Sequence, residues 1–442
     1  MRGTFPTLAC ALVVAASWPR AAVSASSPPS APLQFDSLWR QSTAADFRSW
    51  RPNGAGTADP RSSAGLRLHP RSTTTLVCAQ GDIDGGDARY DSRAGLCRGD
   101  DPRPAEGYYN GGSFFYGTAV SPIHRPGEPI NHLMASWNAE TPAGTWLEIH
   151  VRVLEGARWS AWYSLGVWAS GTSTIRRHSV NHQGSAGGAV DTDTFRTPSG
   201  RATPAYQVSV TLFTARATVS PAIHSIAVIA SRDTTRYAAI LADRSVWGTD
   251  LPVPPRSQML ARYRALGYGG GGEVWCSPTS ISMVMAYWAG ILHRPELIRT
   301  VPQAARGTYD WAYGGTGNWP FNVAYAVRSG LTGYVTRLQS MSQVEQWIKA
   351  RVPIVLSIAY RRGELPGSTF PASAGHLLVV RGFTSAGDVI TNDPGASSDA
   401  RGRMVYPRAA LERVWLASTH GTVYVLYPPG WSVPAKDSRG SW

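Results

Sequence analysis

The sequence predicts a chain of two domains, an N-terminal all-β antiparallel sandwich and a C-terminal α+β domain. Three observations support this fold class. A chain of 442 residues that is 43% hydrophobic has more apolar material than one core usually holds. Apolar and polar residues alternate between residues 35 and 232, whereas helical spacing appears after residue 256. The proline-rich stretch at residues 251–255 separates the two patterns.

The first residues are typical of an export signal. Arg2 supplies a positive charge, residues 8–16 form a short apolar core, and Val23-Ser24-Ala25 fits a cleavage pattern of small residues. We therefore expect residues 1–25 to be a signal peptide and residues 26–34 a linker, so that the mature protein is secreted. No later apolar run reaches the ~18 residues of a membrane-spanning helix, so no membrane span is expected.

Strand-like alternation defines the sandwich domain, residues 35–232. Apolar residues at positions 147, 149, 151 and 153 alternate with polar ones, and the same period recurs at residues 161–167 and 206–212. Turn-forming residues separate these runs. Several such runs indicate an antiparallel sandwich.

The cysteines become informative once export is expected. Cys10 would leave with the signal peptide, and Cys78 and Cys97, which lie 19 residues apart, are predicted to form a disulfide. Cys276 is then the odd cysteine of an exported protein, and its neighbours favour a reactive thiol.

Residues 233–255 are expected to form a stiff connector, residues 256–431 the second domain, and residues 432–442 a tail. Helical spacing covers residues 280–288, and Asn318 is expected to cap a further helix. The pattern Ser342-x-x-Glu345 predicts a capping box before a short helix. Buried strands of a mostly antiparallel sheet are predicted at residues 354–358, 377–380, 389–391 and 423–427.

Cys276 is predicted to begin a helix. Pro278 suits the first turn of a helix, where its missing N–H is not needed. A thiol at that position faces unpaired N–H groups and the positive end of the helix dipole, which lower a thiol pKa and favour the nucleophilic thiolate. The run Gly269–Gly272 upstream permits close approach of the backbone, as an open cleft requires.

A thiolate nucleophile needs a general base, and the base needs a group to orient it. His376 follows a glycine at the start of a predicted buried strand, and Asp393 lies 17 residues later at the turn that ends the next strand. Two adjacent antiparallel strands would bring both side chains to the same end of the sheet. We therefore expect His376 and Asp393 to form the base and its orienting carboxylate.

These motifs resemble the papain-like cysteine peptidases of the bacteriocin-processing (double-glycine) type, in particular their stand-alone exported members. The resemblance is carried by Cys-x-Pro-Thr-Ser at residues 276–280, Gly-His before an apolar strand at residues 375–380, and Asn-Asp-Pro at residues 392–394. It covers roughly residues 251–430. It implies a papain-like fold, with Cys276 as nucleophile, His376 as base and acid, and Asp393 as orienting group. It also implies that Gln258 and the backbone N–H of Cys276 bind the oxyanion.

Two departures from the family pattern stand out. Ser277 occupies a position that is usually glycine, and Gln258 precedes Cys276 by 18 residues, which is a long gap. Neither Lys349 nor Lys436 fits a phosphate-binding loop, so the ATPase of the transporter-linked relatives is not expected.

The resemblance implies a secreted cysteine peptidase that acts on a polypeptide or cell-wall peptide. Alternatives are a cell-wall peptide amidase, an acyl transferase, and an inert peptidase-like protein whose sandwich binds a partner. Asp310 is a reserve acidic residue, and the aromatic, glycine-rich residues 309–319 are a candidate lining of the substrate cleft.

The tryptophans of the sandwich raise the hypothesis of binding to a cell-surface glycan. They are Trp137, Trp146, Trp159, Trp162 and Trp168. Of these, only Trp162 and Trp168 have a strand phase that opposes the apolar face, which predicts that they are accessible.

No cofactor or metal is expected. Asp82, Asp84, Asp87 and Asp91 lack the spacing of a calcium loop, and the chain has neither HExxH nor CxxC. The net charge of +13 is spread along the chain rather than gathered in a basic run, so nucleic acid is not an expected partner.

Overall fold

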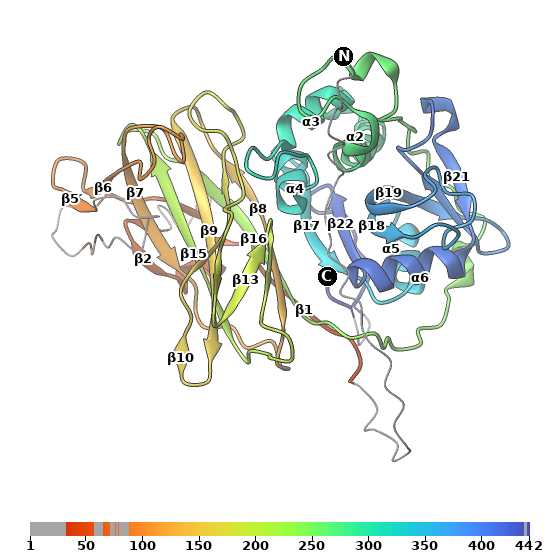
Figure 1. The fold of residues 1–442 in the computed structure, drawn as a ribbon, viewed down its shortest axis with the longest axis horizontal. Coiled ribbons are helices and arrows are strands. Elements are labelled where there is room, and N and C mark those ends of the chain that lie inside the picture. Colours follow the sequence, from red (N-terminus) through yellow and green to blue (C-terminus); the bar gives the residue numbers. More distant parts are fainter. Residues whose placement is uncertain (1–31, 57–64, 71–75, 77, 79–87, 437–439) are drawn as a thin grey trace, which may run out of the picture.

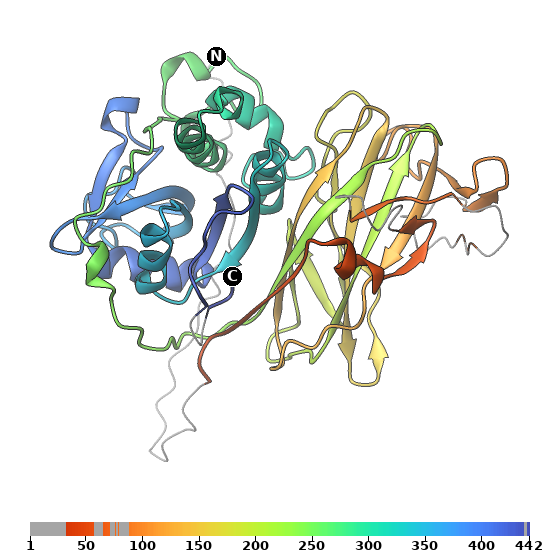
Figure 2. The same cartoon turned by 180° about the vertical axis from the view of Figure 1, so that it is seen from behind.

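The computed structural model describes residues 32–56, 65–70, 76, 78, 88–436 and 440–442. The predicted signal peptide, residues 1–25, lies outside the described residues, as does most of the linker at 26–34. The described chain has an N-terminal part built of antiparallel sheets and a C-terminal part with helices and a sheet (Figures 1 and 2). The predicted fold class is correct at this level.

Two antiparallel sheets make up the N-terminal domain. The first contains, in spatial order, β12 (Gly184–Ser185), β13 (Gly188–Asp191), β14 (Thr194–Arg196), β8 (His132–Glu140), β16 (Ala222–Arg232), β4 (Leu66–Leu68) and β3 (Ala55–Gly56), with β1 (Phe35–Gln41) beside β16. The second contains β10 (Arg158–Trp159), β9 (Thr145–Glu155), β15 (Tyr206–Thr214), β7 (Ser113–Val120), β6 (Leu96–Asp100) and β5 (Arg89–Asp91), with β11 (Tyr163–Trp168) beside β9 and β2 (Arg51–Asn53) beside β7. One short helix, α1 (Ala44–Arg48), follows β1.

The alternation that predicts β9 and β15 works because it gives each strand an apolar face toward the other sheet. The other face of the second sheet is also covered, since a separate apolar cluster contains Trp146, Phe213 and Tyr109. For that reason all nine residues of β15 are buried, its polar ones included. The predicted disulfide between Cys78 and Cys97 is present beside this cluster.

The C-terminal sheet is fully antiparallel. Its strands lie in the order β17 (Thr332–Arg337), β22 (Thr422–Tyr427), β18 (Ile354–Tyr360), β19 (Ser373–Phe383), β20 (Val389–Asn392) and β21 (Arg403–Tyr406). The helices are α2 (Cys276–Leu292), α3 (Val301–Thr308), α4 (Trp319–Val327), α5 (Met341–Lys349) and α6 (Arg408–Thr419). In Figure 1, α2 and α3 lie above the sheet, and α5 and α6 lie below it.

Two helix starts test the capping predictions. Asn318 caps α4 as expected, since its side chain accepts a hydrogen bond of 3.0 Å from the N–H of Phe321. The predicted capping box at Ser342 is wrong, because α5 begins at Met341 and its cap is Ser340. Ser342 instead donates to the carbonyl of Ile240, 2.9 Å away.

The later part of the connector, residues 233–255, packs against the C-terminal sheet. Leu251 donates its N–H to the carbonyl of Arg381 at the end of β19, over 2.8 Å. Asp250 pairs with the guanidinium of Arg381 at 2.5 Å. A side chain at Gly382 would collide with the carbonyl of Thr249, so this strand position must be glycine for the connector to lie there.

Helix α4 joins the two domains. It packs between β8 of the sandwich and β17 of the C-terminal sheet. The ring of Phe321 lies 5.2 Å from the ring of Trp168 and 6.2 Å from that of Trp137. One apolar cluster therefore extends from the sandwich interior into the C-terminal domain.

This packing corrects the prediction for Trp168, which is buried rather than accessible. Trp137 and Trp146 are buried as well. The two remaining tryptophans of that group, Trp159 and Trp162, both contact Arg152, whose guanidinium carbon lies 4.8 Å and 4.5 Å from their ring centroids.

None of the helices in the described part of the chain combines the length and apolar character needed to cross a bilayer. Within the same residues, no group of three or more His, Cys, Asp or Glu side chains is arranged to hold a metal ion. Asp82, Asp84 and Asp87 lie outside the described residues, and Asp91 accepts hydrogen bonds from the N–H groups of its own turn.

Candidate active site

Helix α2 begins at Cys276, as the sequence predicts, with Pro278 in its first turn. The side chain of Cys276 is almost fully buried. The next residue, Ser277, places its hydroxyl 2.9 Å from the hydroxyl of Tyr424 on β22. The departure from glycine at this position therefore supplies a polar contact between the helix start and the sheet.

The first turn of α2 lies against the strand that carries His376. Ser280, one turn after Cys276, donates its hydroxyl to the carbonyl of Leu377 over 3.1 Å. Cys276 also lines the same cavity as Gly375 and Leu377, the two residues on either side of His376 in the chain. The nucleophile and base candidates are thus brought to one region of the fold.

His376 and Asp393 form a buried pair. The Nε2 of His376 lies 2.8 Å from Oδ1 of Asp393, and each side chain is only 1% exposed. Strands β19 and β20 are antiparallel neighbours, with Val379 opposite Asn392, so the chain that leaves β20 at Asp393 runs toward the part of β19 that carries His376. The expectation that these residues share one end of the sheet is confirmed.

The carboxylate of Asp393 accepts further hydrogen bonds. Tyr406 donates its hydroxyl to Oδ2 over 2.6 Å, and the N–H of Gly395 donates to Oδ1 over 2.8 Å. Burial by itself would raise the pKa of Asp393, but the nearby His376 and these hydrogen bonds outweigh it and bring the pKa below its usual value. Asp393 is therefore held as a carboxylate, which favours the N–H of His376 Nε2 facing it.

Two contributors to this site were missed in the sequence. Tyr406 lies on β21, a short strand that was not predicted, and burial next to Asp393 raises the pKa of its hydroxyl. Phe370 contacts His376 edge to face, with ring centroids 5.4 Å apart. Residues 403–406, Arg-Met-Val-Tyr, show no alternation of polar and apolar side chains that would have marked this strand.

Gln258 is fully buried. Its side-chain N–H donates to the carbonyl of Gly272, and the N–H of Gly272 donates back to the Gln258 carbonyl over 3.1 Å. The backbone N–H of Gln258 donates to the carbonyl of Pro394, 2.9 Å away. The long gap before Cys276 is therefore a loop that folds back, so that Gln258 is tied to a residue four positions before the thiol.

The glycine run makes this fold-back feasible. All four glycines from 269 to 272 have positive φ values between 60° and 88°. A Cβ on Gly271 would lie 2.9 Å from the carbonyl oxygen of Gln258. The run is needed for its left-handed backbone and for close approach to Gln258.

A cavity of about 700 Å³ opens beside Cys276. Tyr313, Gly317 and Trp319, from the aromatic and glycine-rich segment, contribute to its wall. His132 and Arg196 of the sandwich domain also line it. The cavity that contains the candidate nucleophile is therefore built by both domains.

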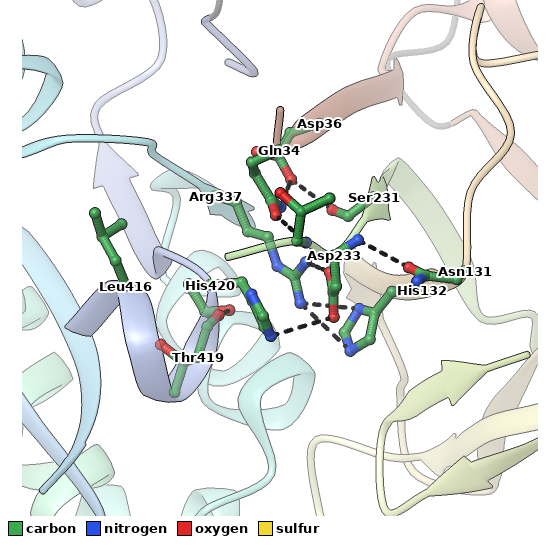
Figure 3. A network of polar contacts seen from close by, with 12 residues as sticks. Gln34, Asp36, Asn131, His132, Ser231, Asp233, Arg337, Leu416, Thr419 and His420 are labelled. Atoms are coloured by element: carbon green, nitrogen blue, oxygen red, sulfur yellow. Dashed lines mark hydrogen bonds and ion pairs between the residues drawn. The ribbon is translucent and has the colours of Figure 1, made fainter. Parts of the chain in front are cut away.

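A polar network closes the junction beside this cavity, and Figure 3 shows its side chains pointing toward one another. Arg337 of β17 pairs with Asp233, which follows β16, and donates to the imidazole of His132, 3.0 Å away. His420, at the end of α6, lies 3.6 Å from Asp233. Burial and the charge of Arg337 lower the pKa of both histidines.

Asp310 does not join His376. Its carboxylate accepts hydrogen bonds from the side chain of Asn318 and from the N–H of Ser179 in the sandwich, each of 3.0 Å. The residue is buried and links the two domains. The reserve acidic candidate is thus part of the domain junction.

Models of known protein families match both parts of the chain. Residues 37–231 match the family model described as the Peptidase C39 N-terminal domain, and residues 250–423 match the Peptidase_C39 like family. Among curated proteins, none matches the chain. A solved structure from Bacillus anthracis, described as a candidate C39-like peptidase, is 15% identical with a TM-score of 0.26, covering 40% of this chain and 96% of its own. The chain belongs to the C39-like peptidases, as the resemblance of its sequence motifs predicts.

Proposed function

We propose that the protein is a secreted cysteine peptidase that hydrolyses amide bonds of polypeptides or cell-wall peptides. Cys276 is the nucleophile, His376 the general base and acid, and Asp393 the orienting carboxylate, within a papain-like domain. The observation that carries the proposal is the buried 2.8 Å contact between His376 and Asp393. His376 belongs to β19, the strand against which the first turn of α2 packs. The match of residues 250–423 to a peptidase family supports it.

The first half of the reaction forms a thioester. Because Nε2 of His376 faces Asp393, the other ring nitrogen is the one that would accept the thiol proton. The thiolate attacks the carbonyl carbon and the C=O electron pair moves to oxygen. When the tetrahedral adduct collapses, the C–N bond breaks and His376 returns the proton to the leaving amine.

The second half releases the acid. His376 takes a proton from water, the hydroxide equivalent attacks the thioester, and the C–S bond breaks to give a carboxylic acid and the thiol. The paired carboxylate of Asp393 stabilises the imidazolium formed in each half.

Gln258 and the backbone N–H of Cys276 are proposed as the donors to the oxyanion. The side-chain hydrogen bond to the carbonyl of Gly272 and the backbone hydrogen bond to the carbonyl of Pro394 support this role, because they hold Gln258 beside the loop before Cys276 and the turn after Asp393. A fixed donor costs no reorganisation when charge develops on the oxygen.

Secretion is proposed from the signal-like first 25 residues. The disulfide between Cys78 and Cys97 supports it, because disulfides persist in oxidising compartments.

The test begins with thiol labelling by iodoacetamide across a pH series. We expect one reactive thiol per chain at Cys276, with labelling near neutral pH that is lost in His376→Ala. The matched control His69→Ala replaces an exposed histidine of the sandwich and should label like the wild type. Equal labelling of all three proteins would refute the triad.

Turnover is measured on a mixed pool of peptides and muropeptides, with products identified by mass spectrometry. Gln258→Ala is expected to retain labelling but to lose about 100-fold to 1,000-fold in kcat. If the wild type releases no product from any pool member while its thiol is reactive, hydrolysis is not its function. Incorporation of an added amine into the products would instead identify acyl transfer.

A further inference from the structure

The cavity beside Cys276 carries an excess of positive charge. Its charged lining side chains are Arg196, Arg337, Arg361, Arg413 and Glu364. Four arginines and one glutamate thus line a space of about 700 Å³. This volume lies within the roughly 300–1,000 Å³ that ligand pockets occupy.

Only part of this charge is compensated nearby. Arg337 is buried and paired with Asp233, as Figure 3 shows. The carboxylate of Glu364 accepts a hydrogen bond of 2.8 Å from the backbone N–H of Arg361 and so stabilises the turn that contains both residues. Arg413 donates to the backbone carbonyl of Glu364 rather than to an acidic side chain.

Arg196 is the cation that the sandwich domain contributes. It ends β14, where it lies opposite His132 on β8, and its side chain is exposed. Among the residues that the structure describes, no carboxylate forms an ion pair with it. It lines the cavity together with His132 and His420.

Neither histidine at that end supplies a negative charge. Arg337 donates to the imidazole of His132, which therefore acts as a neutral acceptor there. Two guanidinium groups thus lie at this end of the cavity. That of Arg337 has a carboxylate partner, and that of Arg196 has none. A bound carboxylate would supply the missing partner, because guanidinium and carboxylate groups match in charge and in geometry.

We infer that this cavity selects peptides that bear a carboxylate near the scissile bond, and that Arg196 of the sandwich domain is a residue that determines this specificity. The effect on cleavage rates rests on the proposed peptidase function. The preference for a carboxylate is a binding property of the cavity and can be measured without cleavage. It also gives the N-terminal domain a direct part in substrate choice.

The experiment uses the full chain and a peptide that the wild type cleaves. Matched versions carry Glu or Gln at each of the three positions on either side of the cleaved bond, and a second set ends in a free acid or an amide. The two sets distinguish a side-chain carboxylate from the C-terminal one. At low ionic strength the preferred carboxylate peptide should show a kcat/KM about five-fold above its neutral match, mainly through KM, as an exposed ion pair allows.

The variants then assign this preference. Arg196→Gln should bring the ratio of acidic to neutral peptide close to one, and Arg196→Glu should invert it in favour of peptides with Lys at the same position. Arg158→Gln, on the exposed hairpin tip of the same domain and not among the cavity residues, should keep the wild-type ratio. Added salt should reduce the ratio in the wild type, because the attraction is screened.

Binding separates this inference from the proposed function. Fluorescence anisotropy of the same labelled peptides with Cys276→Ala measures charge selection with no turnover. A wild-type protein that cleaves nothing, but binds acidic peptides through Arg196, would refute the peptidase and keep the inference. Equal binding and equal cleavage of acidic and neutral peptides, or a preference unchanged in Arg196→Gln, would overturn the inference and leave the peptidase standing.

Discussion

The junction network offers the sharpest stability prediction. Replacing Arg337 by methionine removes a guanidinium whose side chain is 2% exposed and leaves the carboxylate of Asp233, 13% exposed, without it. Removing one partner of a buried ion pair costs about 3–5 kcal/mol of unfolding free energy, because the remaining charge stays desolvated. We expect Arg337→Met to fall in that range at neutral to basic pH.

The penalty should depend on pH. His420 lies 3.6 Å from Asp233, and the charge of Arg337 contributes to the lowered pKa of both His420 and His132. Without Arg337 the folded-state pKa of these rings rises. A protonated His420 then stabilises the folded variant at low pH, and this contribution is lost as the pH rises through that pKa. The penalty is therefore smaller at about pH 5.5 than at about pH 8.

The assay is urea unfolding followed by tryptophan fluorescence at both pH values, for Arg337→Met, Asp233→Asn and the double variant. The double-mutant cycle should give a coupling energy of roughly 2 kcal/mol or more. Arg158→Met, an exposed control, should stay within about 0.5 kcal/mol of the wild type. A penalty below about 1 kcal/mol that is the same at both pH values would refute this account of the network.

Three further predictions concern the site and the sandwich. Tyr406→Phe removes a hydrogen bond to the buried carboxylate of Asp393, so the free energy of unfolding should fall by about 2 kcal/mol. Because that hydrogen bond helps to lower the pKa of Asp393, the acid limb of the pH profile of kcat/KM should move to higher pH. An unmoved acid limb would contradict the link between Tyr406 and Asp393. Glu148→Gln should flatten acid destabilisation. Burial by itself would raise the pKa of Glu148, but the charge of His150 and the hydrogen bonds from Ser164 and Tyr109 outweigh it and lower the pKa to about 2, so roughly 3 kcal/mol present above about pH 4.5 is lost as the pH falls from there to about 2. Urea unfolding from about pH 6 to about pH 2 measures this loss, and parallel curves for the two proteins would contradict it. Gly271→Ala should lower kcat while thiol labelling persists, because its Cβ would press on the Gln258 carbonyl, whereas Gly290→Ala, with open space around its Cβ, should match the wild type.

The sequence predicts those parts of the site that local chemistry determines. The start of α2 at Cys276 follows from Pro278 and the helical spacing after it. The meeting of His376 and Asp393 follows from two consecutive strands joined by a short turn, which can pair only as antiparallel neighbours. These features depend on residues close together in the chain, so a pattern in the sequence can reveal them.

The features that the sequence does not reveal depend on distant partners. Tyr406 reaches Asp393 from a four-residue strand that exists because β20 offers it an edge. The burial of Trp168 follows from Phe321, more than 150 positions later in the chain. The cap of α5 moved to Ser340 because Ser342 finds its acceptor in the connector. Tertiary contacts override local preference in each case.

The course of the connector has a consequence for how the two halves stay together. Because Thr249 and Leu251 hydrogen-bond to the end of β19 and Asp250 pairs with Arg381 and Arg403, this stretch behaves as an added edge of the sheet rather than as a tether. A protease that cut the chain just before Arg244 would leave the fragments associated through α4 and Arg337. A nicked molecule should therefore elute as a single species under native conditions and separate only in denaturant.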